Sequence, residues 1–344
     1  MVDLAPKQAR AGTGTSSKVH LSFGLTPNLR TRPILDGLVT ADGVDLTATT
    51  LHPSELFWRQ LKFAEFDVSE MSVSSLLIAT ARGDDRFVGL PVFSTRFFFH
   101  TWILVRKDAG IDEPADLKGK RVGVPEYQQT AALWSRGVLQ HEFGVAPKDM
   151  EFFMERTPDI SHGGSTGFTA PPGVTVNQIP AEKNIGQMML DKELDATLLY
   201  LPGGNLVDRS TADLDNHPDI KPLFPVTEGK RYFEKTGMYP INHGMVIKRD
   251  IVEKHPWVVL NVFKAFEDAN AICDQQRMDH AAYHFDTGLL PPEAKGAMAR
   301  RLTQHGVIAN RKELEAIAQY SYEQGLTPRQ LKVEEIFAVN TLDK

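Results

Sequence analysis

Residues 65–75 run from a short apolar stretch directly into a cluster of hydroxyl and carboxylate side chains. Residues 66–68 predict a buried strand, and the expected polar turn after it carries Ser69, Glu70, Ser72, Ser74 and Ser75. In an open α/β sheet, loops beyond the strand ends form the ligand crevice, and helix N-termini there can bind anions. A plain serine-rich turn would have the same composition. The stretch therefore predicts an α/β sheet with a candidate ligand site at one edge.

Length and composition narrow the class of protein. A chain of 344 residues favours two domains over one small core. A net charge of -6 without a basic block argues against a nucleic-acid partner, and a single cysteine excludes an internal disulfide. Residues 1–17 lack the apolar core of an export signal, and no later run is long enough to span a bilayer. We expect a cytoplasmic protein with a disordered N-terminal arm over residues 1–17 and no membrane partner.

Two arginines follow the first predicted strand. Residues 19–23 alternate as a strand, and Arg30 and Arg32 come shortly after it. Arginines beside a strand end can hold a carboxylate in a bidentate fork, although solvated surface arginines would look the same.

A second strand-to-helix junction lies in the middle of the chain. Residues 121–124 predict a strand that leads into Tyr127 and Thr130 at the start of a helix. Residues 194–200 predict another strand, which delivers Tyr200 to the same edge. This helix start is the second place where free backbone N–H groups favour an anion.

Residues 91–105 read as one long strand. A period of two places Arg96, Phe98, His100 and Trp102 on one face of that strand. A cation, aromatic rings and an imidazole on one face suit a flat anionic ligand. A buried structural histidine is the competing interpretation for His100.

Residues 236–248 predict a return crossing between the two lobes. Tyr239 and His243 share one face of this segment. Two crossings that each carry a histidine would place His100 and His243 at the hinge, and hence at the cleft. His162 lies in a loop over residues 161–173 that is either a lid or a plain surface loop.

Several stretches resemble a known family. Residues 117–124 are similar to the second-lobe entry of periplasmic-binding-protein-like type 2 folds. The chain also resembles the 4,5-dihydroxyphthalate decarboxylase family, in order and over nearly its whole length from about Val19 onward. The stretches that carry this resemblance are residues 30–33, 65–72, 122–127 and 322–328. The sequence departs from the family pattern at Asn28, Leu29 and Leu76, at residues 203–205 and at residues 305–309.

The resemblance implies an α/β protein of two lobes. Each lobe would be a mixed sheet flanked by helices, with two hinge crossings and C-terminal helices packed on the first lobe. The first lobe would take residues 18–105 and 240–344, and the second would take residues 106–239. A homodimer is the assembly that the family suggests.

The resemblance also implies a carboxy-lyase that acts on a small aromatic carboxylate. It would release carbon dioxide from 4,5-dihydroxyphthalate, or a close analogue, to give protocatechuate, by protonating the ring carbon without a cofactor. We assign His100 and His243 to acid/base chemistry and Glu70 to orienting a histidine or accepting from a hydroxyl. The expected substrate-binding residues are Arg30, Arg32, Ser72, Ser74, Arg96, Phe98, Tyr127, Thr130, Tyr200 and Tyr239.

Three alternatives stay open at this point. A divalent metal held by His100, His162, His243 and Glu70 would use nitrogen and oxygen ligands, but the sequence offers no tight ligand spacing. A solute-binding module for an aromatic carboxylate would share the fold without catalysis. A pyridoxal-dependent pyrimidine-synthesis enzyme would need a cofactor lysine, whereas Lys118 and Lys120 sit in a predicted turn.

Overall fold

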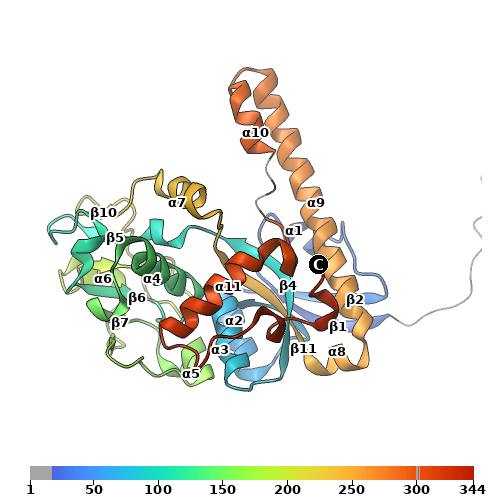
Figure 1. Ribbon diagram of the computed structural model, residues 1–344, viewed down its shortest axis with the longest axis horizontal. Coiled ribbons are helices and arrows are strands. Elements are labelled where there is room, and N and C mark those ends of the chain that lie inside the picture. The colour runs from blue at the N-terminus through green and yellow to red at the C-terminus, as the bar shows by residue number, and fades with distance from the viewer. Residues whose placement is uncertain (1–17, 300, 302) are drawn as a thin grey trace, which may run out of the picture.

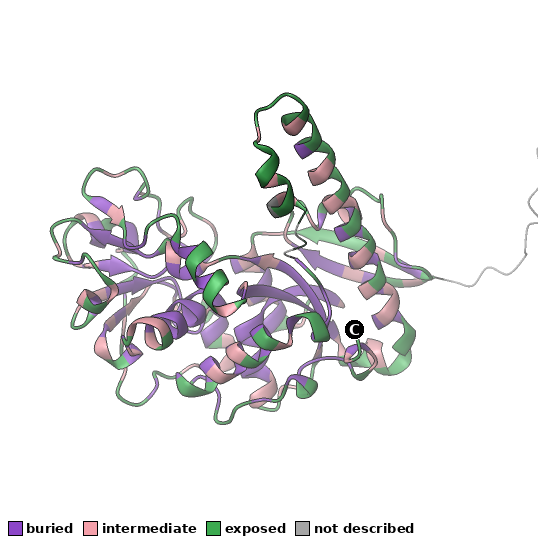
Figure 2. Ribbon diagram, turned by 45° about the horizontal axis from the view of Figure 1, so that its top comes forward, coloured by how far each residue is buried: buried purple, intermediate pink, exposed green. Residues whose placement is uncertain are grey.

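The computed structural model describes residues 18–299, 301 and 303–344, which form two lobes, each built on its own β-sheet (Figure 1). The N-terminal arm expected over residues 1–17 lies outside the described residues. Buried residues run through both sheets and the helices beside them, while exposed residues cover the outside (Figure 2). Among the helices of the described residues, none has both the length and the apolar character needed to cross a membrane.

The first sheet has five strands in the order β2–β1–β3–β11–β4. They are β1 (Val19–Leu25), β2 (Val44–Thr50), β3 (Val68–Ser72), β4 (Phe87–Arg96) and β11 (Ile241–Lys248). β1 is parallel to β2 and β3, whereas β11 is antiparallel to β3 and β4. The sheet is therefore mixed, and β11 inserts a late segment of the chain between two early strands.

The second sheet has six strands in the order β10–β5–β9–β6–β7–β8. They are β5 (Leu104–Arg106), β6 (Arg121–Val124), β7 (Glu151–Met154), β8 (Thr175–Gln178), β9 (Ala196–Thr197) and β10 (Ile220–Pro222). β6 is parallel to β7 and β9, β7 is parallel to β8, and β5 is antiparallel to β9 and β10. This sheet is also mixed, and it consists of the segment between β4 and β11.

Helices cover both sheets. They are α1 (Arg32–Leu35), α2 (Pro53–Phe63), α3 (Val73–Ala81), α4 (Thr130–Phe143), α5 (His162–Thr166), α6 (Ile185–Leu190), α7 (Glu228–Thr236), α8 (Arg249–Lys254), α9 (Pro256–Asp286), α10 (Lys295–Met298) and α11 (Val307–Glu323). α9 packs on α1, β2 and β4, and its far half projects from the body together with α10 (Figure 1). α9 therefore packs on the first lobe, as expected for the C-terminal helices.

α11 contacts both lobes. It packs on α3 of the first lobe and on α4 of the second. Its Tyr320 ring fills the place that a Cβ would take at Gly137 of α4, so the two helices approach more closely there than any other residue at that position would allow. Arg136 of α4 donates from Nε to Oε1 of Gln324, 2.8 Å away, just beyond α11. These contacts join the two lobes.

The strand that ends at the candidate site begins and ends later than the sequence indicates. We predicted a strand over residues 66–68 and a turn from Ser69 onward, but β3 extends to Ser72 and α3 follows at once. All five residues of β3 are buried. Its polar side chains are tolerated in a central strand because they find partners, as the hydroxyl of Ser69 does on the carbonyl of Glu70 (2.9 Å).

The prediction of one strand over residues 91–105 is wrong. β4 ends at Arg96, a 3-10 turn (η1) covers Phe99–Trp102, and β5 starts at Leu104. Aromatic and polar residues occur on both alternating faces of this segment, so a period of two did not indicate where the strand ends. As a result, Arg96, Phe98 and His100 do not share a strand face.

Candidate active site

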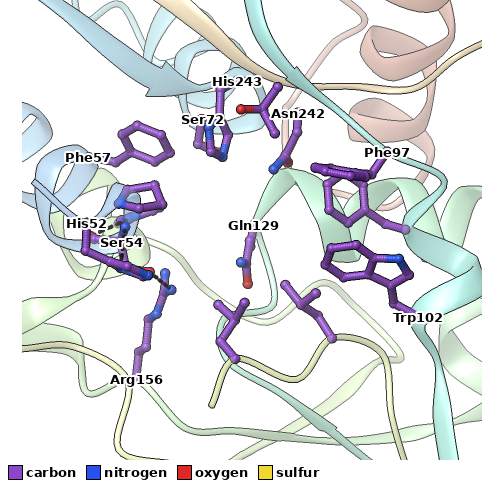
Figure 3. Close-up of a pocket in the computed structure, with 16 residues that line it drawn as sticks. His52, Ser54, Phe57, Ser72, Phe97, Trp102, Gln129, Arg156, Asn242 and His243 are labelled. Atoms are coloured by element: carbon purple, nitrogen blue, oxygen red, sulfur yellow. Dashed lines mark hydrogen bonds between the residues drawn. The ribbon is translucent and has the colours of Figure 1, made fainter. Parts of the chain in front are cut away.

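A cavity of about 160 Å³ lies between the lobes and is lined from both of them (Figure 3). Its basic and imidazole side chains are His52, Arg156, His162 and His243, and its uncharged polar ones are Ser54, Ser72, Thr95, Gln129 and Asn242. Its larger apolar side chains are Phe57, Phe97, Phe99, Trp102, Leu199 and Leu201. In Figure 3, Phe97 and Trp102 lie opposite His52 and Arg156. The cavity therefore has an aromatic wall facing a hydrogen-bonding wall.

A histidine and a buried glutamate form a pair at the cleft end of the first sheet. Nδ1 of His243 lies 3.1 Å from Oε1 of Glu70. The pairing of β11 with β3 sets this contact, because it places His243 opposite Ser72, two residues from Glu70. The ring of His243 also packs edge-on against Phe57, with 4.7 Å between centroids.

The Glu70 carboxyl is held in its ionised form. Burial alone would raise the pKa of this carboxyl, but hydrogen bonds from His243, Ser94 and the backbone N–H of Thr26 (2.9 Å) bring the pKa below its usual value. A carboxylate that accepts from Nδ1 fixes the imidazole orientation and stabilises its protonated form. His243 can therefore use Nε2 to exchange a proton with a ligand.

Arg156 lies at the centre of a buried polar network on the other wall. Its Nε donates to Oδ1 of Asp208 (2.7 Å), its Nη1 to Oε2 of Glu126 (3.1 Å), and its Nη2 to Oγ of Ser54 (2.6 Å) and Oδ2 of Asp208 (3.1 Å). Burial alone would lower the pKa of the guanidinium, but the two carboxylates raise it. Because Ser54 belongs to the first lobe and the other three residues to the second, the network also joins the lobes.

Two more histidines lie beside this network. Nδ1 of His52 accepts from the backbone N–H of Ser54 (3.4 Å) at the start of α2. Nε2 of His162 lies 3.2 Å from the carbonyl oxygen of Ser54, which can only accept. Nδ1 of His162 is buried without a hydrogen bond and lies 3.7 Å from Oε2 of Glu126. Burial lowers the pKa of both imidazoles.

Comparisons with known proteins place the chain in a family. Residues 29–165 match the family model described as the periplasmic substrate-binding protein of a phosphonate ABC transporter. A protein of Comamonas testosteroni named 4,5-dihydroxyphthalate decarboxylase is 32% identical over 333 residues, which cover 95% of this chain and 98% of that protein. The chain belongs to the 4,5-dihydroxyphthalate decarboxylase family. A Pseudomonas putida protein of the same name is 37% identical over 182 residues, which cover 53% of this chain and 70% of that one.

Solved structures confirm the predicted fold of this family member. The aliphatic sulphonate binding protein SsuA of Escherichia coli aligns with a TM-score of 0.54 and 15% identity, covering 95% of this chain and 100% of that one. The desulfurization enzyme DSZB aligns with a TM-score of 0.52 and 15% identity, covering 95% and 99%. The two-lobed periplasmic-binding-protein-like fold expected from the sequence is therefore present.

Six residues that the sequence singled out meet at the cleft of this decarboxylase-family protein. Ser72, His162 and His243 line the cavity, and Glu70 lies directly behind His243. Ser74 and Thr130 lie behind Ser72: the Ser72 and Thr130 hydroxyl oxygens are 2.7 Å apart, and the backbone N–H of Ser74 donates to Thr130 Oγ1 (2.9 Å). The two helix starts expected to bind an anion therefore face each other. The Thr130 hydroxyl accepts a hydrogen bond from one of the backbone N–H groups at the start of α3.

The three arginines assigned to carboxylate binding do not line the cavity. Nη1 of Arg30 donates to the carbonyl of Ser94 (2.9 Å), and Arg32 forms an exposed pair with Asp36. Arg96 is buried and donates to the carbonyl of Tyr239 (2.9 Å) and to Asn310. We correct this assignment, because all three guanidinium groups are engaged elsewhere. Arg156 is the arginine at the cavity.

The aromatic residues assigned to substrate binding also lie elsewhere. Phe98 packs against Tyr239 and Tyr232, and the Tyr239 hydroxyl donates to the carbonyl of Arg96 (3.0 Å). Tyr127 is buried under the Arg136 guanidinium, 3.7 Å from its ring centroid, and the Tyr200 hydroxyl donates to the carbonyl of Ala212 (2.6 Å). Because β4 ends at Arg96, its neighbour Phe97 faces the cavity instead of Phe98.

His100 is a structural histidine. It lies in η1, outside the cavity lining, with Nε2 3.2 Å from Oε1 of Glu228 and its ring against Phe224 and Tyr232. Burial lowers its pKa to about 4, despite the opposing effect of Glu228. The expectation that His100 takes part in proton transfer is therefore corrected.

This buried histidine should make the protein less stable in acid. The unfolded imidazole, with an ordinary pKa of 6.5, binds a proton between pH 6.5 and about 4 while the folded one does not, so stability falls as pH drops through this window. We expect about 2 kcal/mol of stability to be lost between pH 7 and pH 5 through this residue. His100→Gln, which retains a donor toward Glu228, should remove that loss in urea unfolding. His280→Gln, at an exposed position, should keep it; an unchanged pH slope in His100→Gln would contradict the assignment.

The metal alternative is not matched by the arrangement of its residues. Among the side chains of the described residues, no group of three or more His, Cys, Asp or Glu could hold a metal ion. His100 pairs with Glu228, whereas His162 faces Glu126 and His243 contacts Glu70. The four candidate ligands are thus distributed over three separate pairs.

Several cavity residues were not predicted. His52 and Ser54 follow β2 at the start of α2, so the rule for strand-to-helix junctions applied to this segment would have found them. Arg156 follows β7 in the same way. Gln129 and Asn242 stood beside residues that were singled out, but no pattern in the sequence distinguished them.

Proposed function

We propose that this chain is a carboxy-lyase that converts 4,5-dihydroxyphthalate, or a close analogue, into protocatechuate and carbon dioxide. Both relatives described above carry that enzyme name. The observation that carries the proposal is the buried Glu70–His243 pair at a cavity with an aromatic wall. A solute-binding module without catalysis is the weaker candidate, since a binding site does not require an acid/base pair.

The chemistry needs one proton delivered to one ring carbon. A ring hydroxyl para to the departing carboxylate pushes electrons into the ring, and the carbon that bears the carboxylate accepts a proton. The bond to the carboxylate then breaks, carbon dioxide leaves, and its electron pair restores the aromatic ring. One proton is consumed in each turnover, and no electrons are gained or lost.

The residues of the cavity match these steps. His243 would donate the proton from Nε2, and the Glu70 carboxylate would stabilise the protonated imidazole before transfer. Phe97, Phe99 and Trp102 would hold the ring flat against their wall. Amide groups such as that of Gln129, whose Oε1 has no hydrogen-bond partner in the described structure, would accept from the ring hydroxyls.

We also propose that the reaction proceeds without a cofactor, because the dihydroxylated ring supplies its own electrons. Dialysis of the purified protein against EDTA should therefore leave turnover unchanged within about twofold. General acid catalysis by a side chain contributes about 10²–10⁴-fold and does not require a metal ion. Metal analysis before and after dialysis gives the control. A loss of activity that is restored by one divalent ion would overturn cofactor independence.

The function itself is tested by incubating the protein with 4,5-dihydroxyphthalate and measuring protocatechuate and carbon dioxide. Equimolar formation of both products is expected. Tight binding without either product would instead support the solute-binding module.

A further inference from the structure

The charges around the cavity do not suit a dicarboxylate. Arg156 is the only lysine or arginine among the described residues that line the cavity. Three carboxylates lie next to lining residues: Asp208 and Glu126 contact Arg156, and Glu70 contacts His243. With one guanidinium and three carboxylates, the site has a net negative charge whenever the cavity histidines are neutral. A ligand with two carboxylates would be repelled by such a site.

Arg156 has little capacity left for a ligand. A guanidinium has five N–H groups, and four of them are directed at Asp208, Glu126 and Ser54. The arrangement already neutralises its charge with two buried carboxylates. Arg156 therefore holds the two lobes together, and it cannot form the bidentate fork that a free arginine offers a carboxylate.

His52 and His162 are the remaining basic groups on this wall. The charged groups that act on His52 are Asp208 and Glu55, which favour its proton, and Arg156 and His243, which oppose it. Those that act on His162 are Glu126 and Asp208, which favour its proton, and Arg156, which opposes it.

Each of these imidazoles has one free ring nitrogen. His52 uses Nδ1 as an acceptor from Ser54, so its Nε2 is free. His162 uses Nε2 on the carbonyl of Ser54, and its Nδ1 is buried, unpartnered and close to Glu126. A proton on this Nδ1 would turn a lone pair that faces a carboxylate into a donor toward it. Burial lowers the pKa of both imidazoles, and a bound anion beside them would favour their protonated forms.

We propose that the site binds its aromatic diacid together with protons, and that protonated His52 and His162 supply the positive charge that recognises the carboxylates. This inference rests on the proposed function for the ligand class, an aromatic diacid. It assigns recognition to histidines, whereas from the sequence we assigned it to arginines. Affinity should consequently fall as pH rises, by about tenfold per pH unit for each proton taken up.

Isothermal titration with phthalate tests the proposal, because phthalate has both carboxylates and lacks the hydroxyls that drive decarboxylation. Titrations at pH 7.5 in buffers of different ionisation enthalpy give the number of protons bound with each ligand. We expect about one to two protons for the wild type, and a plot of log Kd against pH whose slope equals that number.

Two variants isolate the histidines while keeping their hydrogen bonds. Asn at position 52 retains an acceptor for the backbone N–H of Ser54, and Gln at position 162 retains a donor to its carbonyl. The double variant His52→Asn/His162→Gln should lose at least about one proton of uptake and bind phthalate about tenfold more weakly at pH 6.5. His20→Asn, at an exposed position on β1, is the matched control and should keep full uptake.

The outcomes separate this proposal from the proposed function. Zero proton uptake by the wild type, unchanged uptake in the double variant, or no binding of phthalate would each overturn histidine recognition. If the protein decarboxylates 4,5-dihydroxyphthalate but takes up no protons with phthalate, only the present inference fails. If it binds phthalate with proton uptake but makes no protocatechuate, the inference stands and the decarboxylase function fails.

Discussion

Replacing His243 by Asn should lower kcat by at least about 100-fold, because general acid catalysis contributes about 10²–10⁴-fold and this residue would deliver the proton. Asn keeps a donor close to the Nδ1 position, so the hydrogen bond to Glu70 can persist while Nε2 is lost. The measurement is the initial rate of protocatechuate formation, together with thermal unfolding to show that the variant folds.

A second variant tests the pairing itself. Glu70→Gln keeps hydrogen-bonding capacity toward Ser94 and Thr26 but removes the negative charge that stabilises protonated His243. Removing that charge takes away the carboxylate that stabilises the imidazolium during proton delivery, so kcat should fall and its pH profile should differ from that of the wild type. A merely structural role would lower kcat without moving the pH profile.

The control for this pair is another histidine–glutamate pair far from the cavity. His141 contacts Glu323 on the surface, with 2.6 Å between Nε2 and Oε2. His141→Gln should leave kcat and its pH profile unchanged. Retention of more than about a third of the wild-type kcat by His243→Asn would contradict proton delivery by this residue, given the size of the general acid effect.

Replacing Arg156 by Met should destabilise the protein by about 3–5 kcal/mol, because it leaves Asp208 and Glu126 buried without their cation. The guanidinium is almost fully buried, with only 1% of its side chain exposed, so water cannot replace the lost partner. Urea unfolding measures the change. Arg32→Met is the matched control, since its exposed pair with Asp36 contributes only about 0.3–0.5 kcal/mol.

A double variant distinguishes the unpaired charge from lost packing. Adding Asp208→Asn to Arg156→Met removes one of the orphaned carboxylates and should restore part of the lost stability. If Arg156→Met alone cost less than about 1 kcal/mol, the buried network would not hold the lobes together as described.

The fold and one wall of the site follow from local patterns in the sequence. Glu70 and Ser72 could be located because a strand leads into them, and His243 because it lies on a predicted crossing strand. The same reasoning failed for His100, because a period of two was extended past the end of β4 at Arg96. Where aromatic residues fill both faces, periodicity does not indicate where a strand stops.

The other wall could not be predicted because it is assembled from distant segments. Ser54 and Asp208 are 154 positions apart, and Arg156 and Asp208 are 52 apart, yet all three meet in one buried network. Each residue considered alone looks like an ordinary polar side chain near a loop. Only the tertiary arrangement shows that four of the five N–H groups of Arg156 are engaged and that His52 and His162 line the same cavity.

The position of α11 has a kinetic consequence. This helix joins α3 and α4 on one side of the molecule, whereas polar contacts such as Ser54–Asp208 and the Trp58 indole on the carbonyl of Asp159 join the lobes beside the cavity. We expect the lobes to separate about α11 when ligand is exchanged, which would break those polar contacts. Raising the solvent viscosity should therefore slow turnover whenever this motion, rather than ring protonation, limits the rate.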